Sequence, residues 1–237
     1  MKSLFAVICT LCLATSASAT TLLFDFGRTD TQSPFNPGTL TWNNVVPATT
    51  SLFSIFEEGG TPVAGLTFEI TDTFFQVGEP TANIGSTSPT GDAAVYPVDA
   101  TSDVFFGHNG GFAGQDPNPF AEVKLSGLNP GDVHDFTFFA SRQPVGDIRE
   151  TEYIVTGATA ESVLLNPSNN DSEVVSVLGM AADANGEITV GFQSGPNSTS
   201  NFYYINVMQV DISPIPEPTS LGLAACLLGG LAIRRRV

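Results

Sequence analysis

Between residues 20 and 213 the apolar and polar side chains alternate almost entirely with period two. The alternation is regular from Leu66 to Thr71 and again from Ala121 to Ser126. Because successive side chains of a β-strand point to opposite faces, this pattern predicts strands with one buried face and one solvated face. Further strands are expected at 21–26, 40–46, 53–57, 73–77, 104–107, 135–142, 152–157, 162–165, 173–178, 187–193 and 202–211. No segment of useful length shows a helical stripe.

Turn residues separate the expected strands. Gly59 and Gly60, the segment Asn129 to Asp132, and the pair Asn185 and Gly186 are such signals, and the last pair is typical of a two-residue hairpin. Many short strands with regular turns, together with 18 phenylalanines in the chain, predict an all-β fold. We expect an antiparallel two-sheet sandwich of jelly-roll type, and a single closed sheet is the alternative.

The two ends of the chain have the character of targeting segments. Lys2 precedes an apolar run at 4–13, and the small residues at 17–19 suit a signal peptidase. At the other end a Pro-Glu-Pro triplet precedes an uncharged run at 219–233, which an arginine triplet closes. The sequence therefore predicts a signal peptide at 1–19, one β-sandwich domain at 20–213 and a hydrophobic tail at 214–237.

The C-terminal tail is too short for a permanent membrane anchor. Its run at 219–233 would span about 22 Å as a helix, less than the ~30 Å hydrocarbon core. A removable sorting signal therefore fits better than an ordinary tail anchor, and the basic end is expected to stay cytoplasmic. The residues that define this signal are Pro216, Glu217, Pro218, Arg234, Arg235 and Arg236.

This tail resembles the PEP-CTERM sorting signal of Gram-negative bacteria. The resemblance implies recognition by an exosortase, cleavage near the Pro-Glu-Pro triplet, and release to the cell surface or into extracellular polymer. The expected partners are then the export machinery, signal peptidase and an exosortase-type processing enzyme. The tail would be a transmembrane helix only transiently, in the inner membrane, before processing.

The charge balance excludes some partners. The chain has 8 Lys and Arg against 24 Asp and Glu, a net charge of −16. Within 20–213 the basic side chains are Arg28, Lys124, Arg142 and Arg149. Because phosphate binding needs a basic face, nucleic acid is excluded as a partner, and anionic lipid is disfavoured for the same reason. An acidic surface suits a secreted protein that meets divalent cations or uncharged polymers such as polysaccharide.

Cysteine usage and histidine content limit the chemistry. The three cysteines are Cys9, Cys12 and Cys226, all in the terminal segments. The domain can therefore hold neither a disulfide nor a cysteine-ligated metal, and two histidines leave a zinc site short of ligands. His134 and Ser141 suggest a hydrolase, but no Gly-x-Ser-x-Gly turn accompanies them. Strand alternation would place His134 with the inward-facing Phe136 and Phe138 or at the start of the strand, and exposure after the Gly-Asp turn is the expectation. No catalytic residue and no cofactor are assigned. A structural calcium is left open at Asn166 to Asp171 or Asp183 to Glu187.

Several segments resemble a galactose-binding-like or carbohydrate-module-like jelly-roll domain of exported bacterial proteins. They are LLFDFG at 22–27, LTWNNV at 40–45, LSGLNPGDVHDFTFFASR at 125–142, RETEYIVTG at 149–157 and NFYYINVMQVDI at 201–212. The resemblance implies a non-catalytic module at the cell surface.

Arg142 and Arg149 are the first candidates for a binding site. They lie close in sequence to Asp147 and Glu150 in a domain that is poor in cations. Bidentate salt bridges to neighbouring carboxylates would tie the loop 143–148 between two strands. The alternative is that the same guanidinium groups donate to sugar hydroxyls.

Trp42, with Asn43 and Asn44, is the second candidate. The tryptophan would stack on a pyranose face while the amides bind hydroxyls, or it would belong to the core. His108, in a glycine-rich loop, is the third candidate. Of the adjacent Tyr203 and Tyr204, one is expected to face solvent because side chains alternate along a strand.

Taken together, these observations predict an exported, surface-displayed, non-enzymatic β-sandwich, either a structural or a carbohydrate-associated component of extracellular polymer. A secreted glycan-active hydrolase with a carboxylate pair and a purely structural adhesin are the alternatives. A deep cleft with two facing carboxylates of raised pKa would favour the enzyme. A shallow aromatic platform would favour binding, and a closed surface with neither feature would favour the adhesin.

Overall fold

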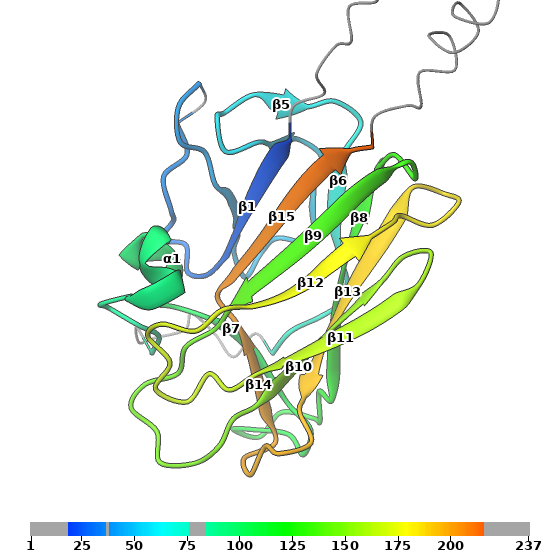
Figure 1. The fold of residues 1–237 in the computed structure, drawn as a ribbon. Helices are drawn as coiled ribbons and strands as arrows, with labels where there is room; N and C mark the ends of the chain where they lie inside the picture. Colours follow the sequence, from blue (N-terminus) through cyan, green and yellow to red (C-terminus); the bar gives the residue numbers. More distant parts are fainter. Residues whose placement is uncertain (1–18, 37, 76–83, 216–237) are drawn as a thin grey trace, which may run out of the picture.

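The computed structural model describes residues 19–36, 38–75 and 84–215. It is nearly all β, with two larger sheets and two small ones (Figure 1). The first larger sheet has the order β12, β9, β15, β1, β2. Its strands are β1 (Thr20–Phe26), β2 (Asn43–Val45), β9 (Asp132–Phe139), β12 (Val175–Met180) and β15 (Val207–Pro214).

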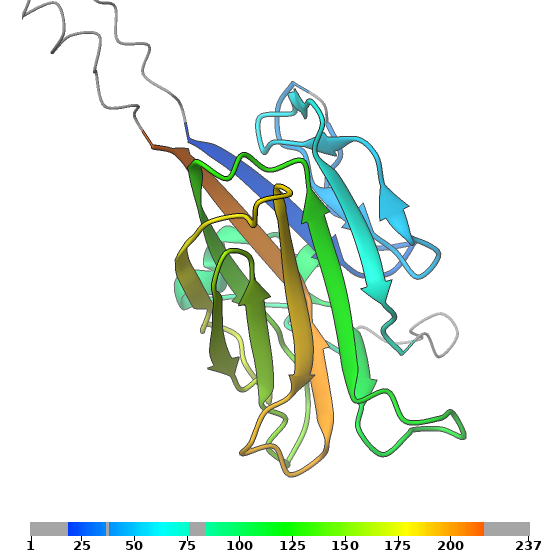
Figure 2. The ribbon, with the colours of Figure 1, turned by 90° about the vertical axis from the view of Figure 1, so that its right-hand side faces the viewer.

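The second larger sheet has the order β11, β10, β13, β8, β6, β3. Its strands are β3 (Ser51–Leu52), β6 (Thr67–Asp72), β8 (Phe120–Ser126), β10 (Thr151–Thr156), β11 (Ala160–Leu165) and β13 (Glu187–Ser194). The small sheets pair β4 (Ile55–Phe56) with β5 (Pro62–Val63), and β7 (Phe105–His108) with β14 (Phe202–Ile205). β1 begins and β15 ends at the same end of the molecule, where Thr20 pairs with Ile212 (Figure 2).

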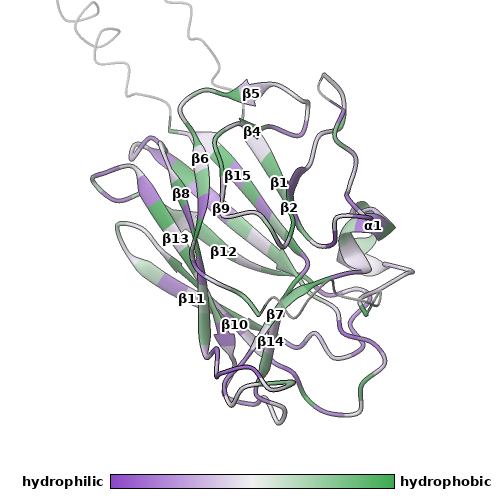
Figure 3. Ribbon diagram, turned by 180° about the vertical axis from the view of Figure 1, so that it is seen from behind, coloured by the Kyte–Doolittle hydropathy of each residue, from purple (hydrophilic) through white to green (hydrophobic). Residues whose placement is uncertain are grey.

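The two larger sheets enclose the main hydrophobic core. Phe24 on β1 stacks on Phe68 of β6 with ring centroids 5.2 Å apart, and Phe138 on β9 stacks on Tyr153 of β10 at 4.5 Å. These rings come from opposite sheets, so the two layers form a sandwich rather than one closed sheet. Hydrophobic and hydrophilic residues alternate along the strands, while the loops are largely hydrophilic (Figure 3). The period-two pattern therefore identified the strands for the physical reason expected.

A second apolar cluster covers the outer face of the five-stranded sheet. Two short helices lie there, the 3-10 helix η1 (Gly91–Val95) and α1 (Val98–Thr101). The buried members of this cluster are Leu23, Trp42, Ala93, Tyr96, Ala100, Phe139 and Val207. The part of this face around Leu23, Phe139 and Val207 is therefore dry, whereas Thr137 and Ser176 on the same face form an exposed hydrogen bond. Within the ranges that the structure describes, no helix combines the length and apolar character needed to cross a membrane.

The structure differs from the sequence prediction in several strands. β1 and β2 pair in parallel, so the sheet is not wholly antiparallel. The strand expected at 202–211 is two strands in different sheets, β14 and β15, which separate at Asn206. The strands expected at 40–46 and 53–57 are shorter, and in the described part of 73–77 only Phe75 pairs, in an isolated bridge with Phe106. Residues 1–18 and the predicted sorting signal, from 216 onward, lie outside the described residues.

Candidate functional site

The small sheet of β7 and β14 carries a group of partly exposed aromatic side chains. In its antiparallel register Phe202 lies opposite His108, and Tyr204 lies opposite Phe106. These four side chains share one face of the sheet, and the side chains between them point to the core. Gly107 lies on that inner side, where any Cβ would overlap the ring of Tyr203. A glycine is therefore required for the two strands to pack this closely.

We call Phe106, His108, Phe112 and Phe202 the aromatic platform. The ring of Phe202 lies 4.3 Å from that of His108 and 5.1 Å from that of Phe112, measured between centroids. Phe112 is 44% exposed, and the other three are half-buried. The platform lies toward the end of the sandwich opposite the start of β1 (Figure 1). It is a shallow apolar surface with one titratable ring, His108.

The loop after β7 holds Phe112 over the platform. His108 and Asn118 exchange two backbone hydrogen bonds, of 3.1 and 2.9 Å, which close the base of this loop. Tyr203, from the core side of β14, also bonds to the side chain of Asn118. His108 Nδ1 accepts a hydrogen bond from the backbone N–H of Gly110 at 3.0 Å, so the neutral ring carries its proton on Nε2. His108 therefore offers a donor at the platform.

A groove of about 450 Å³ adjoins the platform. Thr73 to Phe75 line one part of it, and Gly114 to Asn118 line the other. Phe75 connects the groove to the platform, because its ring stacks on Phe106 with centroids 6.0 Å apart and planes inclined by 7°. Gln115, Asp116 and Asn118 are the polar residues of the second part, and the amide of Asn118 already donates to the backbone oxygen of Thr73 at 2.7 Å.

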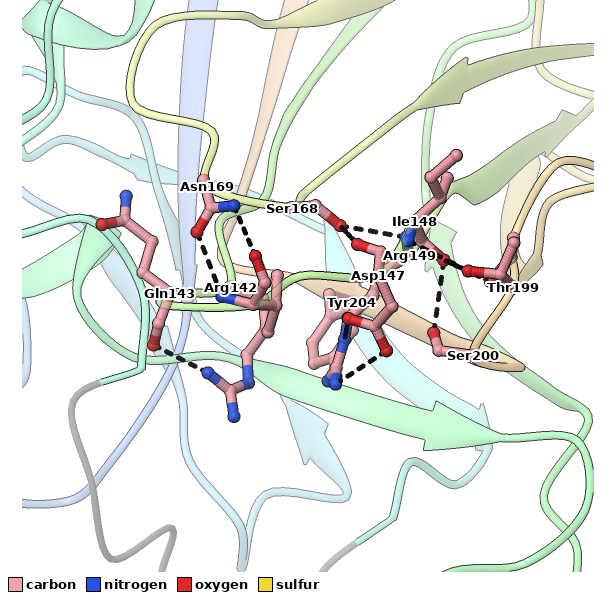
Figure 4. Close-up of polar contacts among 12 residues, drawn as sticks. Arg142, Gln143, Asp147, Ile148, Arg149, Ser168, Asn169, Thr199, Ser200 and Tyr204 are labelled. Carbon is pink, nitrogen blue, oxygen red and sulfur yellow. Dashed lines mark hydrogen bonds and ion pairs between the residues drawn. The ribbon is translucent and has the colours of Figure 1, made fainter.

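Arg149 packs against the same phenylalanine as His108. Its guanidinium carbon lies 4.8 Å from the centroid of Phe202 and 5.8 Å from that of Tyr204, within cation–π range. Its Nε and Nη2 donate to the two oxygens of Asp147 at 2.9 and 3.2 Å, and Nη1 donates to the hydroxyl of Tyr204 (Figure 4). These hydrogen bonds hold the pKa of Asp147 below its usual value. The bidentate pair expected from the sequence is present.

Arg142 is held differently. Its Nη1 donates to the backbone oxygen of Gln143 at 2.7 Å, and its backbone bonds to Pro167 and Asn169 (Figure 4). Among the described residues it forms no ion pair with a carboxylate. The expected salt bridge of Arg142 is therefore wrong. The neighbouring carboxylate is Asp147, and both of its oxygens accept hydrogen bonds from Arg149 instead.

Trp42 does not form a binding surface. It is 1% exposed and packs edge-on against Tyr96 in the second apolar cluster, with centroids 6.1 Å apart. Stacking on a sugar is thereby excluded, and the core alternative holds. Asn43 is also buried, and its side-chain amide forms hydrogen bonds with the backbone of Leu23 and Phe56. Asn44 donates to the backbone oxygen of Ser33 at 3.1 Å.

Two expectations of exposure are also wrong. His134 is fully buried, its Nδ1 lies 3.1 Å from the backbone oxygen of Met180, and burial lowers its pKa. Ser141 lies just beyond the same strand, about 23 Å away at ~3.3 Å per residue, so the two cannot form a catalytic pair. Tyr203 and Tyr204 are both buried. Tyr203 points to the core, and Tyr204 on the other face of β14 is covered by Arg149.

In the loops considered for calcium, side-chain oxygens accept hydrogen bonds from the protein itself. Asn170 Oδ1 accepts from the backbone of Ser172 and Glu173, and Asp171 accepts from Ser86 and Gln143. Asp183 closes its own turn by accepting from the backbone of Asn185 and Glu187, which lowers its pKa. Over the described ranges, no group of three or more His, Cys, Asp or Glu side chains is placed to hold a metal ion.

A carboxylate pair that the sequence did not reveal lies in the interior. Asp25 and Asp103 are 2% and 0% exposed. Burial, followed by the charge of Asp103, raises the pKa of Asp25 to about 8, and burial also raises the pKa of Asp103. A raised pKa would suit a general acid, but a polysaccharide cannot reach carboxylates at this depth. This pair therefore does not supply the hydrolase alternative.

Replacing Arg149 with alanine is expected to lower the free energy of unfolding by about 1 to 3 kcal/mol, because Asp147 and the Tyr204 hydroxyl lose charge-assisted hydrogen bonds. Urea melts at low and high salt measure this loss, and salt should restore only part of it because the Arg149 side chain is 14% exposed. Arg142→Ala is the matched control and should cost less. Equal midpoints for wild type and Arg149→Ala would contradict the structural role.

No family model matches the sequence, and neither does any curated protein. Three solved structures show a low level of similarity to this chain. CpGH89CBM32-5 from Clostridium perfringens, in complex with GalNAc-β-1,3-galactose, is 14% identical with a TM-score of 0.32, over 62% of this chain and 94% of that one. An F5/8 type C domain from Bacteroides fragilis is 10% identical with a TM-score of 0.34, over 62% and 93%. A family 35 carbohydrate binding module from an environmental isolate is 15% identical with a TM-score of 0.28, over 59% and 96%.

Proposed function

We propose that this protein is an exported, surface-displayed, non-catalytic β-sandwich of jelly-roll type that binds polysaccharide on its aromatic platform. The observation that carries the proposal is the grouping of Phe106, Phe112 and Phe202 around His108 beside an open groove. The apolar C–H face of a sugar ring packs well on exposed aromatic rings, while amide, carboxylate and imidazole groups bind its hydroxyls. Phe75 lines the groove and stacks on Phe106, so the two features are neighbours here.

The expected ligand is an uncharged glycan. The chain carries a net charge of −16, and the guanidinium of Arg149 is already paired with Asp147. An anionic polysaccharide would therefore meet a net repulsive field, and the guanidinium that packs on Phe202 is already occupied. The export signals predicted at both ends of the chain complete the proposal: an exosortase-type enzyme would process the tail, and the domain would become part of extracellular polymer.

A glycan array probed with the purified protein tests the ligand class, and Phe112→Ala tests the site. We expect this substitution to weaken binding of any glycan hit about tenfold, or ~1.4 kcal/mol, because a partly exposed ring of the platform is lost. Phe53→Ala is the matched control, since Phe53 is 80% exposed and lies outside the platform. Unchanged affinity for Phe112→Ala, or an equal loss for Phe53→Ala, would place the binding site elsewhere.

A further inference from the structure

The chain contains two Asn-Gly pairs, Asn109 with Gly110 and Asn185 with Gly186. In such a pair the glycine nitrogen can attack the side-chain carbonyl carbon of the asparagine and close a five-membered succinimide ring. Glycine favours this reaction because it has no Cβ to obstruct the approach and leaves the backbone free to adjust. Two conditions then decide the rate: whether the asparagine amide is free to turn, and whether a base can take the proton of the glycine N–H.

The pair Asn185 and Gly186 meets neither condition. Asn185 Nδ2 donates to Asp183 Oδ2 at 3.0 Å, and its backbone N–H donates to Asp183 Oδ1 at 2.9 Å. The side-chain amide must therefore leave a carboxylate before it can turn toward the glycine nitrogen. The N–H of Gly186 donates to the backbone oxygen of Asp183 at 3.0 Å, and a carbonyl oxygen is too weak a base to take its proton.

The pair Asn109 and Gly110 lies in the turn that leaves the aromatic platform, and both residues are exposed. The backbone of this turn is fixed: the N–H of Gly111 donates to the oxygen of His108 at 3.3 Å, and the N–H of Asn109 donates to the oxygen of Asn201 at 3.0 Å. Among the described residues, none forms a hydrogen bond with the side-chain amide of Asn109. The side chain is therefore free to turn toward the glycine nitrogen while the backbone stays in place.

His108 supplies the base that the other pair lacks. The N–H of Gly110 donates to His108 Nδ1 at 3.0 Å, so the basic nitrogen of the neutral imidazole already lies on the proton that must be removed. The ring is held there by its edge-on contact with Phe202, with centroids 4.3 Å apart. It also lies over the glycine, since an ideal Cβ on Gly110 would be 3.4 Å from His108 Cε1. Packing on the platform therefore positions this base.

We propose that Asn109 is a self-modification site, at which His108 catalyses conversion of the asparagine to aspartate and isoaspartate. His108 Nδ1 takes the proton of the Gly110 nitrogen as that nitrogen forms a bond to Asn109 Cγ. The bond between Cγ and Nδ2 then breaks, and the imidazolium returns the proton so that ammonia leaves. Water opens the succinimide at either carbonyl carbon, which gives aspartate or isoaspartate. The reaction consumes one water and releases one ammonia, with no change of oxidation state.

Either product places a new carboxylate beside the aromatic platform, and isoaspartate also adds a methylene group to the backbone of the turn. The conversion itself needs no ligand. Its effect on glycan binding rests on the proposed function: the turn connects His108 to Phe112, so a platform that binds glycan should bind it more weakly after conversion. The extent of conversion and the affinity for glycan are measured separately, so failure of one proposal is distinguishable from failure of the other.

Timed incubation of the full-length protein at neutral pH, followed by peptide mass spectrometry that separates aspartate from isoaspartate, tests the proposal. In the folded protein Asn109 should convert about tenfold faster than Asn185, and in guanidinium chloride the two rates should become similar. His108→Phe keeps a ring against Phe202 but has no Nδ1. It should slow conversion of Asn109 about tenfold, because hydroxide is then the remaining base, and should leave Asn185 unchanged as the internal control.

Conversion of Asn185 at the same rate as Asn109 in the folded protein would overturn the site. An unchanged rate at Asn109 in His108→Phe would overturn the role of the imidazole, and His108→Gln repeats this test if the first variant does not fold. The affinity of wild type for any glycan hit should fall as Asn109 converts, whereas that of Asn109→Ser should stay constant. Constant affinity in wild type after full conversion would overturn the effect on the platform but not the modification.

Discussion

Asn206→Ala is expected to lower the free energy of unfolding by about 3 to 6 kcal/mol, because several buried backbone groups lose their partner. Asn206 is fully buried between β14 and β15. Its Nδ2 donates to the backbone oxygens of Thr101 and Asp103 at 3.0 and 2.5 Å, and its Oδ1 accepts from the backbone N–H of Ser141 at 2.9 Å. A methyl group can replace none of these bonds.

Urea-induced unfolding measures this loss, and Asn206→Asp separates its parts. Aspartate keeps an acceptor for Ser141 but has no donor for Thr101 and Asp103, so it should also be strongly destabilising. Asn185→Ala is the control, because that side chain bonds only to Asp183 in an exposed turn. A loss below about 1 kcal/mol for Asn206→Ala would show that this junction is satisfied in another way.

Period-two alternation predicted most strands but could not predict where one strand ends and another begins. The segment 202–211 alternates in a way that suits one long strand, yet it changes sheets at Asn206. The cause is non-local, since the side chain of Asn206 bonds to Thr101, Asp103 and Ser141. An asparagine within an apolar run is a weak signal on its own, because such residues also occur on solvated strand faces.

The sequence named His108 and Arg149, but not the phenylalanine that joins them. Both residues were chosen for local reasons, a glycine-rich loop in one case and scarce cations in the other. They meet on Phe202 because β14 pairs with β7 from a distant part of the chain. Trp42 shows the reverse case. Its local pattern suits a core or a surface position equally, and the covering helices η1 and α1 decide for the core.

The covering helices η1 and α1 also explain why the sequence did not indicate that Asp25 is buried. It alternates with Phe24 and Phe26, so it lies on the face of β1 that faces away from the main core. On a solvated face it would be an ordinary surface carboxylate. Residues 91–103, which follow much later in the sequence, close over that face and bring Asp103 beside it. Burial of a strand's outer face is a property of the assembled fold, and no local pattern records it.

The contribution of Asp25 to stability is expected to decrease as the pH rises from about 4 to about 8. The folded state raises the pKa of Asp25 from 3.8 to about 8, so across this window the folded protein keeps a proton that the unfolded chain has released. Stability therefore falls with rising pH, by on the order of 6 kcal/mol in total at ~1.4 kcal/mol per pKa unit. The charged groups that act on this carboxyl are Asp99 and Asp103, and Arg28 acts on Asp103.

The difference in unfolding free energy between wild type and Asp25→Asn, measured by urea melts at several pH values, isolates this contribution from that of buried His134. The stability of wild type should fall relative to that of the variant throughout this window, because the amide of the variant never ionises. A difference that stays constant from pH 4 to pH 8 would mean that Asp25 is ionised in the folded protein throughout, and that its burial is compensated by a permanent partner.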